Sequence, residues 1–404
     1  MRAMSPQEWI GLALRWAHLI AGIAWIGSSF YFIWLDSHLE PADPARADAD
    51  AEGSLWMVHS GGFYRVERRR IGPGRVPKTL HWFKWEAMIT WLTGCALLGV
   101  VFYSTRGIYL LDPAVSGISN RAAVGLGIGV LVLGWFVYDR LWLALGERAP
   151  GAATGISLGL LAATVAGLTS LLSGRAAFLH VGALLGTIMV LNVWERILPA
   201  QSRMIKATER GETPDFSNSN KAKLRSVHNS YMTFPVLFLM ISSHFPGTYA
   251  PPARALVLML LILVGMGARY LMIGKSSRRA WTLAPMVAAV AALVVLTAPA
   301  RLQGFTGAPS PARADGPAPS YAEVQAVVLA RCVACHSTAP RVAAFGAAPG
   351  GVNFETPGAL RRYANRIQLR VVETRTMPLG NMTGMTEDER ALLARWIAHG
   401  APES

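Results

Sequence analysis

The chain has 404 residues, of which 52% are hydrophobic and 15% charged, and its formal net charge is +14. This composition is typical of a membrane protein with a soluble part attached. The positive charge does not indicate nucleic-acid binding, because the basic residues fall mainly in alternate loops between apolar segments, as membrane topology predicts.

Eight apolar segments follow one another along the first 300 residues, and most have the ~20 residues that a helix needs to cross a bilayer. The sixth segment is short and contains Pro235, so we expect it to be kinked or partly buried among other helices. The first is long and rich in aromatic residues, which favours a retained helix over a cleaved signal peptide. The segments lie near 9–35, 82–104, 121–144, 152–172, 176–198, 231–245, 253–273 and 280–299.

Lys and Arg concentrate in the loops that follow the first, third, fifth and seventh segments. The intervening loops hold little beyond Arg106, Arg121, Arg175 and Arg254. The positive-inside rule therefore predicts an inner-membrane protein with both termini on the periplasmic side. The long first loop, residues 36–81, contains the turn Ser60-Gly61-Gly62 and a basic run. It is interpreted either as a solvated topology determinant or as a cap over a cytoplasmic opening.

Residues 300–319 are rich in Pro, Gly and Ala and are typical of a semi-extended linker. Just beyond them, Cys332 and Cys335 are spaced C-x-x-C and are followed at once by His336. This is the attachment signal of a c-type haem, with two thiols for the porphyrin vinyl groups and an imidazole for the iron. A zinc knuckle or a redox dithiol is disfavoured by the adjacent His and by the lack of a second Cys pair.

The second axial ligand of the iron is expected downstream of the Cys pair. Met377 is preferred, because a thioether is the usual partner of His in cytochromes c and Pro378 fixes the backbone beside it. Met382 and Met385 are rivals. A helix should follow, with Thr386 and Glu389 as its capping box and with Leu392, Leu393, Trp396 and Ile397 as its apolar stripe.

Ionisable residues within the apolar segments are costly and are therefore functional candidates. His18, His180 and His244 should lie in the outer half of the membrane, either hydrogen-bonded between helices or as ligands of a haem b. A second redox centre is attractive because one haem carries one electron, whereas oxidation of a closed-shell substrate removes two. No G-x-G-x-x-G fingerprint follows a predicted strand. Near the inner boundary we expect the polar residues His81, Lys84, Glu86, Glu195, His228 and Asn229.

Several longer motifs resemble those of the bacterial membrane-bound urate oxidases that carry a fused cytochrome c domain. The motifs are RWAH (15–18), AWIGSSF (24–30), KWE (84–86), NVWERI (192–197), PAQ (199–201), HNSYMTFP (228–235) and MISSH (240–244). The resemblance covers nearly the whole chain. It implies an all-α polytopic membrane bundle of about eight spans (1–299), the linker (300–319) and a small all-α periplasmic cytochrome c domain (320–404).

The resemblance also implies oxidation of urate to 5-hydroxyisourate with water as the oxygen source. Electrons would pass through haem c to a soluble or membrane cytochrome or a terminal oxidase. Urate is a planar monoanion, so its site needs amide partners, a cation, a base and an aromatic face. His228 and Asn229 beside Arg225, faced by Lys84 and Glu86, satisfy this requirement.

Two other functions remain open at this stage. The chain could be a non-catalytic respiratory module that takes electrons from quinol or a partner subunit, or a transporter fused to a cytochrome. The inner position of the predicted urate site raises a further difficulty, because a hydrocarbon core of roughly 30 Å would separate it from an outer haem.

Overall fold

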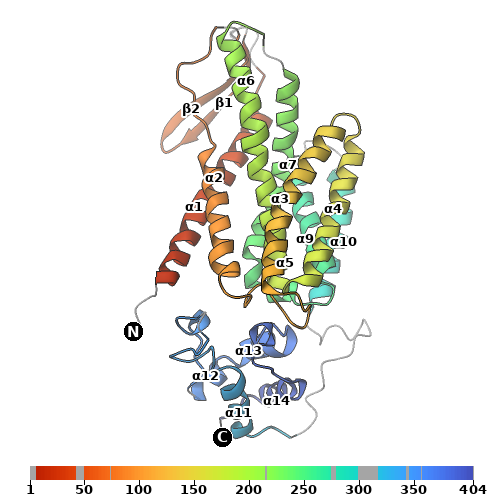
Figure 1. Ribbon diagram of the computed structural model, residues 1–404. Coiled ribbons are helices and arrows are strands. Elements are labelled where there is room, and N and C mark those ends of the chain that lie inside the picture. Colours follow the sequence, from red (N-terminus) through yellow and green to blue (C-terminus); the bar gives the residue numbers. More distant parts are fainter. Residues whose placement is uncertain are drawn as a thin grey trace.

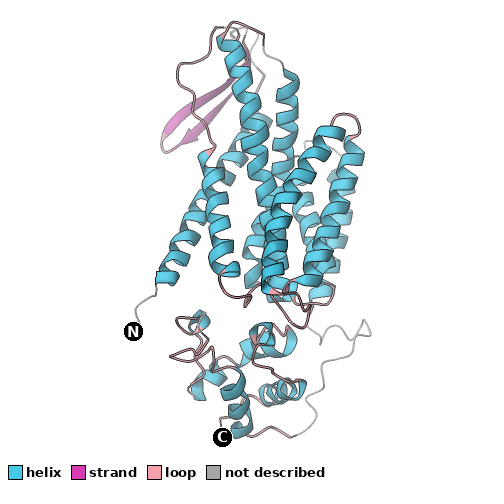
Figure 2. Cartoon of the chain, in the orientation of Figure 1, coloured by secondary structure: helices cyan, strands magenta, loops and turns pink. Residues whose placement is uncertain are grey.

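The computed structural model describes residues 6–41, 50–72, 74–213, 216–273, 279–298, 317–342, 345–355 and 357–403, and the chain is predominantly helical. Figure 1 shows a bundle of long helices with a smaller helical domain at one end, and Figure 2 shows that strands form only a small part of what is described. Most of the predicted linker, residues 300–316, lies outside the described residues.

The bundle contains a helix at each of the eight predicted segments. The helices are α1 (Pro6–His38), α2 (Trp85–Leu97) continued by the π-helix η1 (Leu98–Tyr103), α3 (Asn120–Leu145), α4 (Pro150–Leu171), α5 (Gly174–Leu191) continued by the π-helix η2 (Asn192–Ile197) and α6 (Leu198–Glu209), α7 (Phe216–Ile241), α9 (Arg254–Ile273) and α10 (Arg279–Thr297). Two short helices, η3 (Ser242–His244) and α8 (Pro246–Tyr249), connect α7 to α9.

Within the described residues, six helices are long and apolar enough to cross a membrane. They begin with α1, α2, α3, α4, α5 and α9, so the chain is a multi-pass membrane protein. The two remaining predicted spans do not reach this standard. The first half of α7 is polar, and the described apolar part of α10 is the shorter helix Trp281–Thr297. Figure 1 shows the beginning of α1 and the C-terminal domain at the same end of the bundle.

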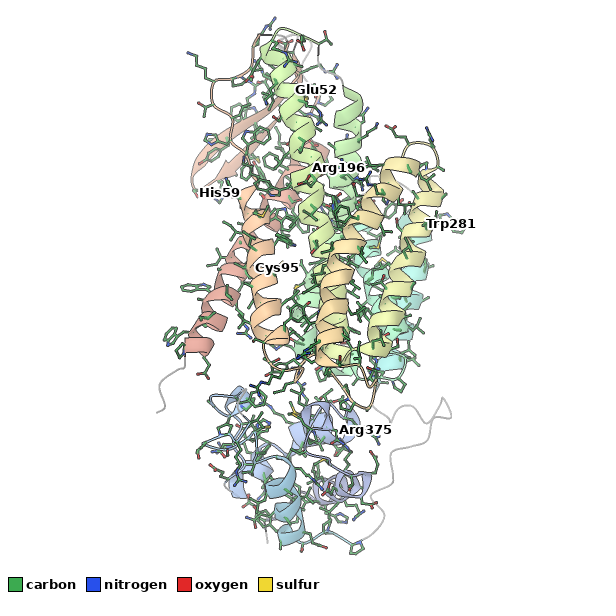
Figure 3. All side chains as sticks on the ribbon, in the orientation of Figure 1. Glu52, His59, Cys95, Arg196, Trp281 and Arg375 are labelled. Atoms are coloured by element: carbon green, nitrogen blue, oxygen red, sulfur yellow. The ribbon has the colours of Figure 1, made fainter. Side chains whose placement is uncertain are left out.

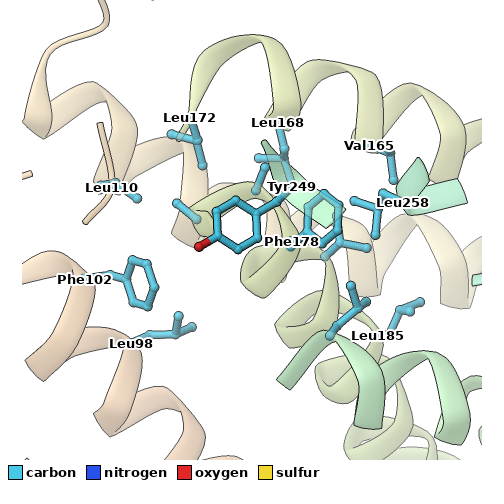
Figure 4. Packing of buried hydrophobic residues seen from close by; sticks show 14 of the residues in the cluster. Leu98, Phe102, Leu110, Val165, Leu168, Leu172, Phe178, Leu185, Tyr249 and Leu258 are labelled. Carbon is cyan, nitrogen blue, oxygen red and sulfur yellow. The ribbon is translucent and has the colours of Figure 1, made fainter. Parts of the chain in front are cut away.

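Helix α5 forms the centre of the bundle. In an apolar stretch of 18 residues within its span 72% of the residues are buried, whereas the corresponding stretches of the other five spans have 11–22% buried. The main apolar core surrounds this helix at the end nearest the C-terminal domain, where Phe178 packs against Tyr249, with Leu168, Leu172 and Leu258 beside them (Figure 4). Low burial elsewhere leaves apolar side chains facing outward, as a lipid environment requires.

Helix α7 continues through Pro235 without a break, so the expected short sixth segment is in fact a helix of 26 residues. The neighbouring helix α9 makes room for the proline ring with Gly265, where a Cβ would lie 2.8 Å from Pro235 Cδ. The proline therefore forms part of the packed contact between α7 and α9.

The long first loop folds into an antiparallel hairpin, β1 (Ala51–His59) and β2 (Gly62–Arg69), so the expectation of a purely α-helical chain was wrong here. Ser60 and Gly61 both have positive φ, as a two-residue hairpin turn requires. The predicted basic run lies on β2, where Arg68 pairs with Glu52 at 2.9 Å. Cross-strand ion pairs such as this one support the pairing of the two strands.

The C-terminal domain is a small helical unit. It contains α11 (Tyr321–Arg331), η5 (Pro349–Gly351), α12 (Pro357–Arg362), α13 (Ala364–Ile367), the π-helix η6 (Gln368–Glu373), η7 (Leu379–Asn381) and α14 (Glu387–Ala398). The predicted capping box of Thr386 and Glu389 is confirmed at the start of α14, and Leu393 and Trp396 on this helix are fully buried.

Candidate functional site

The C-x-x-C-H motif lies at the end of α11, where Cys332 is the C-cap residue. Burial raises the pKa of the Cys332 thiol to about 12. The imidazole Nδ1 of His336 lies 3.0 Å from the Val352 carbonyl oxygen, and burial lowers the pKa of this imidazole. The Val352 carbonyl therefore fixes the tautomer with its proton on Nδ1 and leaves Nε2 available for a metal.

Met377 is half-buried against the same apolar core as Cys332 and Phe354. Its backbone is held at both ends, because its N–H donates to the Arg370 carbonyl at 2.9 Å and its carbonyl accepts from Arg390 Nη1 at 2.9 Å. Of the two rivals, Met382 is 46% exposed and Met385 is buried within the core. An anchored, half-buried thioether is the best placed of the three for an axial ligand.

These side chains fit a c-type haem in the chemistry of their donor set: two thiols, one imidazole with a free Nε2 and one thioether. Phe354 adds an aromatic ring 5.4 Å from the ring of His336. The four residues predicted for this role, Cys332, Cys335, His336 and Met377, thus lie in one small domain.

The C-terminal domain contacts the end of the bundle through a polar junction. Arg370 Nη1 lies 3.5 Å from the Tyr249 hydroxyl, and the rings of Tyr109 and Phe345 meet edge to face at 6.3 Å. A cavity of about 360 Å³ lies at this junction, with Arg175 on the bundle side and Arg375 on the domain side. Figure 3 shows Arg375 at the edge of the domain that faces the bundle.

The three predicted outer histidines lie apart from one another. His18 Nδ1 lies 2.9 Å from the Thr90 carbonyl oxygen on α2, which leaves Nε2 free. His180 is completely buried and uses both ring nitrogens, with the Ala176 carbonyl and the Tyr103 hydroxyl. His244 is exposed at the end of η3. Of these three histidines, His18 alone has one ring nitrogen bonded to a carbonyl and the other free, the arrangement typical of a metal-ligating histidine.

A buried polar network connects α3, η2 and α7 in the half of the bundle remote from the C-terminal domain. Asp139, 4% exposed, accepts bonds from Arg196 Nε at 2.8 Å and from Arg225 Nη2 at 3.0 Å. Asn192 donates to the side-chain oxygen of Asn229 at 2.8 Å. The π-helix η2 carries both Asn192 and Arg196, and such irregular turns are frequent at functional sites.

His228 belongs to the same network. Its Nδ1 lies 2.7 Å from the Tyr138 hydroxyl, which also accepts a bond from Asn192 at 3.2 Å. The Trp142 ring packs edge to face on the imidazole at 4.1 Å. His228 and Tyr138 also line one end of a largely apolar groove of about 1200 Å³ between α3, α4, α7 and α9.

Lys84 and Glu86 form a second cluster, where the chain enters α2. The Lys84 ammonium lies 5.8–5.9 Å from the ring centres of Trp82, Trp85 and Trp194. Glu86 Oε2 is buried and has no hydrogen-bond partner. No hydrogen bond joins the two predicted pairs in the described residues: Lys84 lies against Trp194 of η2, whereas His228 bonds to Tyr138 of α3 and Asn229 to Asn192 of η2 and Met189 of α5.

Sequence reasoning missed Asp139, Tyr138 and Arg269. Asp139 lies in the apolar segment 121–144, and an acidic residue in such a segment could have marked it as a candidate. Arg269 is 3% exposed, donates from Nε to the Ser230 hydroxyl at 2.8 Å and lies 4.1 Å from the ring centre of Phe30. In the described residues, no group of three or more His, Cys, Asp or Glu could hold a metal ion.

The spans, the buried ionic network and the docked C-terminal unit define a polytopic helical membrane protein with a polar interior. The chain belongs to the urate oxidase N-terminal family, whose model matches residues 5–299. The match covers the whole bundle and ends before the C-terminal domain. No curated protein and no solved structure matches this chain.

Proposed function

We propose that this protein oxidises urate at the bacterial inner membrane and passes the electrons through a haem c in its C-terminal domain to a respiratory cytochrome or terminal oxidase. The observation that carries the proposal is the family match over residues 5–299, which assigns the bundle to a urate oxidase family. The haem motif on the same chain, in a domain that contacts the bundle, supplies the route for the electrons.

In this proposal Cys332 and Cys335 hold the porphyrin, and His336 and Met377 are the axial ligands of the iron. A haem of this kind accepts and releases one electron at a time. Uric acid and one water become 5-hydroxyisourate, two protons and two electrons, so each turnover requires two successive transfers. The chain's own residues bind the substrate, receive the protons and separate the reaction from bulk water.

The membrane orientation is part of the proposal. The Lys and Arg distribution supports a cytoplasmic position for the hairpin end and a periplasmic position for the C-terminal domain. The separation of the two ends is evident in Figure 3, where Arg196 lies well within the bundle and Arg375 lies beyond its other end.

A row of aromatic contacts connects the part of the bundle nearest the C-terminal domain with that domain. His180 packs against Phe102 at 6.0 Å, Phe102 against Tyr109 at 6.2 Å, and Tyr109 against Phe345 of the C-terminal domain at 6.3 Å. Conjugated rings in contact provide a path for electrons toward the domain. The path supports the proposed route of the electrons between the bundle and the haem.

The decisive test is anaerobic titration of the purified, oxidised protein with urate, followed by visible absorbance of haem c. We expect one urate to reduce two haems and 5-hydroxyisourate to form. The Cys332→Ala variant, which lacks covalent haem, should give no absorbance change. Failure of urate to reduce the haem in protein that dithionite reduces normally would refute the proposal.

One observation favours a second function. The apolar groove beside His228 and Tyr138 opens between membrane helices and suits a lipid-soluble quinol, whose ring would meet these polar side chains. The chain would then be an electron-transfer module without urate chemistry. The same titration with a short-chain quinol separates the two functions, because reduction by quinol and not by urate would favour the module.

A further inference from the structure

Arg269 on α9 is a buried cation that has no counterion among the described residues. Its side chain is 3% exposed, and in the described part of the chain its polar contact is the Ser230 hydroxyl. Its Nη2 is buried and has no hydrogen-bond partner. Charges buried in this way are expensive unless an opposite charge compensates them. An anionic ligand would provide that compensation.

Side-chain and helix contacts connect the elements around Arg269 into a closed ring. Arg269 joins α9 to Ser230 of α7 and to Phe30 of α1, and the rings of Phe30 and Phe234 join α1 to α7 at 5.7 Å. Helix α1 packs along α2, and Trp85 of α2 meets Trp194 of η2 at 5.4 Å. The ring closes where η2 packs on α7. The five elements α1, α2, η2, α7 and α9 therefore surround one region.

Three of these elements carry buried polar atoms that lack a partner. They are the acceptor Glu86 Oε2 on α2 and the donors Trp194 Nε1 on η2 and Arg269 Nη2 on α9. Glu86 and Arg269 have opposite charges, yet they form no ion pair with each other. Buried polar groups in native proteins are almost always satisfied. A polar ligand held between these elements would give the two donors and the acceptor the partners that they lack.

We infer that this region binds the substrate as a planar purine monoanion, with Arg269 as its charge anchor, Trp194 N–H and Ser230 as further polar contacts, Glu86 as acceptor for a ring N–H, and Phe30 as an aromatic neighbour. The chemistry matches because urate presents carbonyl acceptors and N–H donors around its edge and one negative charge. This inference rests on the proposed function and locates its substrate.

The His228 side of α7 is less suited to an anion. Its buried cation, Arg225, has a buried Nη1 without a hydrogen-bond partner, but its charge is compensated by Asp139, and His228 Nδ1 is bonded to Tyr138. Of the residues predicted from the sequence, Glu86 then belongs to the substrate region. His228 and Asn229 instead support the contact between α7 and its neighbours, His228 through Tyr138 and Asn229 through Asn192 of η2. Asn229 holds this position by donating to the Met189 carbonyl at 2.8 Å.

The test measures binding without turnover. Full-length protein is reduced with dithionite, so that it cannot accept electrons, and urate affinity is measured by equilibrium dialysis. We expect Arg269→Gln to weaken binding about tenfold or more, because a charge-assisted hydrogen bond is lost. Trp194→Phe keeps the ring and removes the donor, and should weaken binding by a smaller factor. Hypoxanthine, a neutral purine, should bind wild type and Arg269→Gln equally.

Arg254→Gln is the matched control, since Arg254 lies at the opposite end of the same helix and bonds to the Thr169 carbonyl. It should bind urate like wild type. A second readout is thermal: urate should raise the midpoint of wild type and not that of Arg269→Gln, whereas the midpoints without urate should match. A lower ligand-free midpoint with unchanged affinity would show that Arg269 is purely structural and would overturn the inference.

Two outcomes separate this inference from the proposed function. If wild type binds urate and His228→Gln loses binding while Arg269→Gln and Trp194→Phe retain it, the inference is wrong and urate oxidation is unaffected. If wild type binds urate as expected here but urate does not reduce the haem, the proposed oxidation is wrong and the binding site stands. If Arg269→Gln does not fold, Trp194→Phe decides the inference alone.

Discussion

Replacing Asp139 by Asn tests the buried network of the bundle most directly. The substitution keeps the shape of the side chain and removes the charge that compensates Arg225, whose side chain is 6% exposed. Loss of one partner from a buried ion pair costs about 3–5 kcal/mol, because the other charge remains unpaired. Arg196 adds little, since its side chain is 36% exposed and an ion pair near the surface contributes about 0–1 kcal/mol.

The expected destabilisation corresponds to a fall of roughly 5–10 °C in thermal midpoint, measured in detergent by loss of soluble protein. Glu147→Gln is the control, because its ion pair with Lys221 at 3.4 Å is exposed on both sides and should contribute less than about 0.5 kcal/mol. The double variant Asp139→Asn/Arg225→Gln should have a higher thermal midpoint than Asp139→Asn alone, because the second substitution removes the unpaired charge. Equal midpoints for Asp139→Asn and Glu147→Gln would refute the reasoning.

Four further predictions concern the cofactors and the network. Cys332→Ala should abolish the covalent haem, seen as loss of haem staining on a denaturing gel. Met377→Ala should change the absorbance spectrum of the haem and lower its reduction potential. Met382→Ala should leave the spectrum and the potential unchanged. The reverse result would indicate that Met382 is the axial ligand. If the bundle holds a b-type haem on His18, a pyridine haemochrome spectrum of His18→Ala should keep the c-type haem and lose the b-type signal, and an unchanged b-type signal would exclude this ligand. Tyr138→Phe removes a hydroxyl shared by two side chains and should cost about 1–3 kcal/mol of unfolding free energy; an unchanged midpoint would contradict that bonding.

The helical framework could be predicted because its signal is local. Each apolar run of about 20 residues must form its backbone hydrogen bonds internally in lipid, so sequence alone indicates a helix. The capping box of Thr386 and Glu389 is local for the same reason, and the structure confirms it. Residues 51–69 lack this kind of signal. Their strands depend on backbone pairing across the hairpin, with the pair of Glu52 and Arg68 as added support, and the same charges are equally consistent with a solvated loop.

The polar interior was predicted only in part, because its partners are far apart in sequence. Asp139 and Arg225 are 86 residues apart, and no spacing rule connects them. Arg269 lies in the last turns of the apolar segment 253–273, where a long cationic side chain can reach the membrane interface, so the sequence gives little reason to place it inside. Glu86 was predicted from its position at a helix start. What the structure adds is that its Oε2 is buried and unpartnered.

The inferred substrate region lies farther from the C-terminal domain than the aromatic path does. His18 matters because it lies between the two. Arg269 lies fifteen residues beyond Arg254, or about 22 Å along α9 from the end of the helix nearest the C-terminal domain. His180, the innermost ring of the aromatic path, lies only about 9 Å from the corresponding end of α5. Rapid electron transfer from the Arg269 region to His180 therefore requires another redox-active group between the two. His18 lies about 18 Å along α1, between these two levels, and its Nε2 is free. A haem held by His18 would divide the distance, and this is the reason to test the His18→Ala variant for loss of a b-type haem.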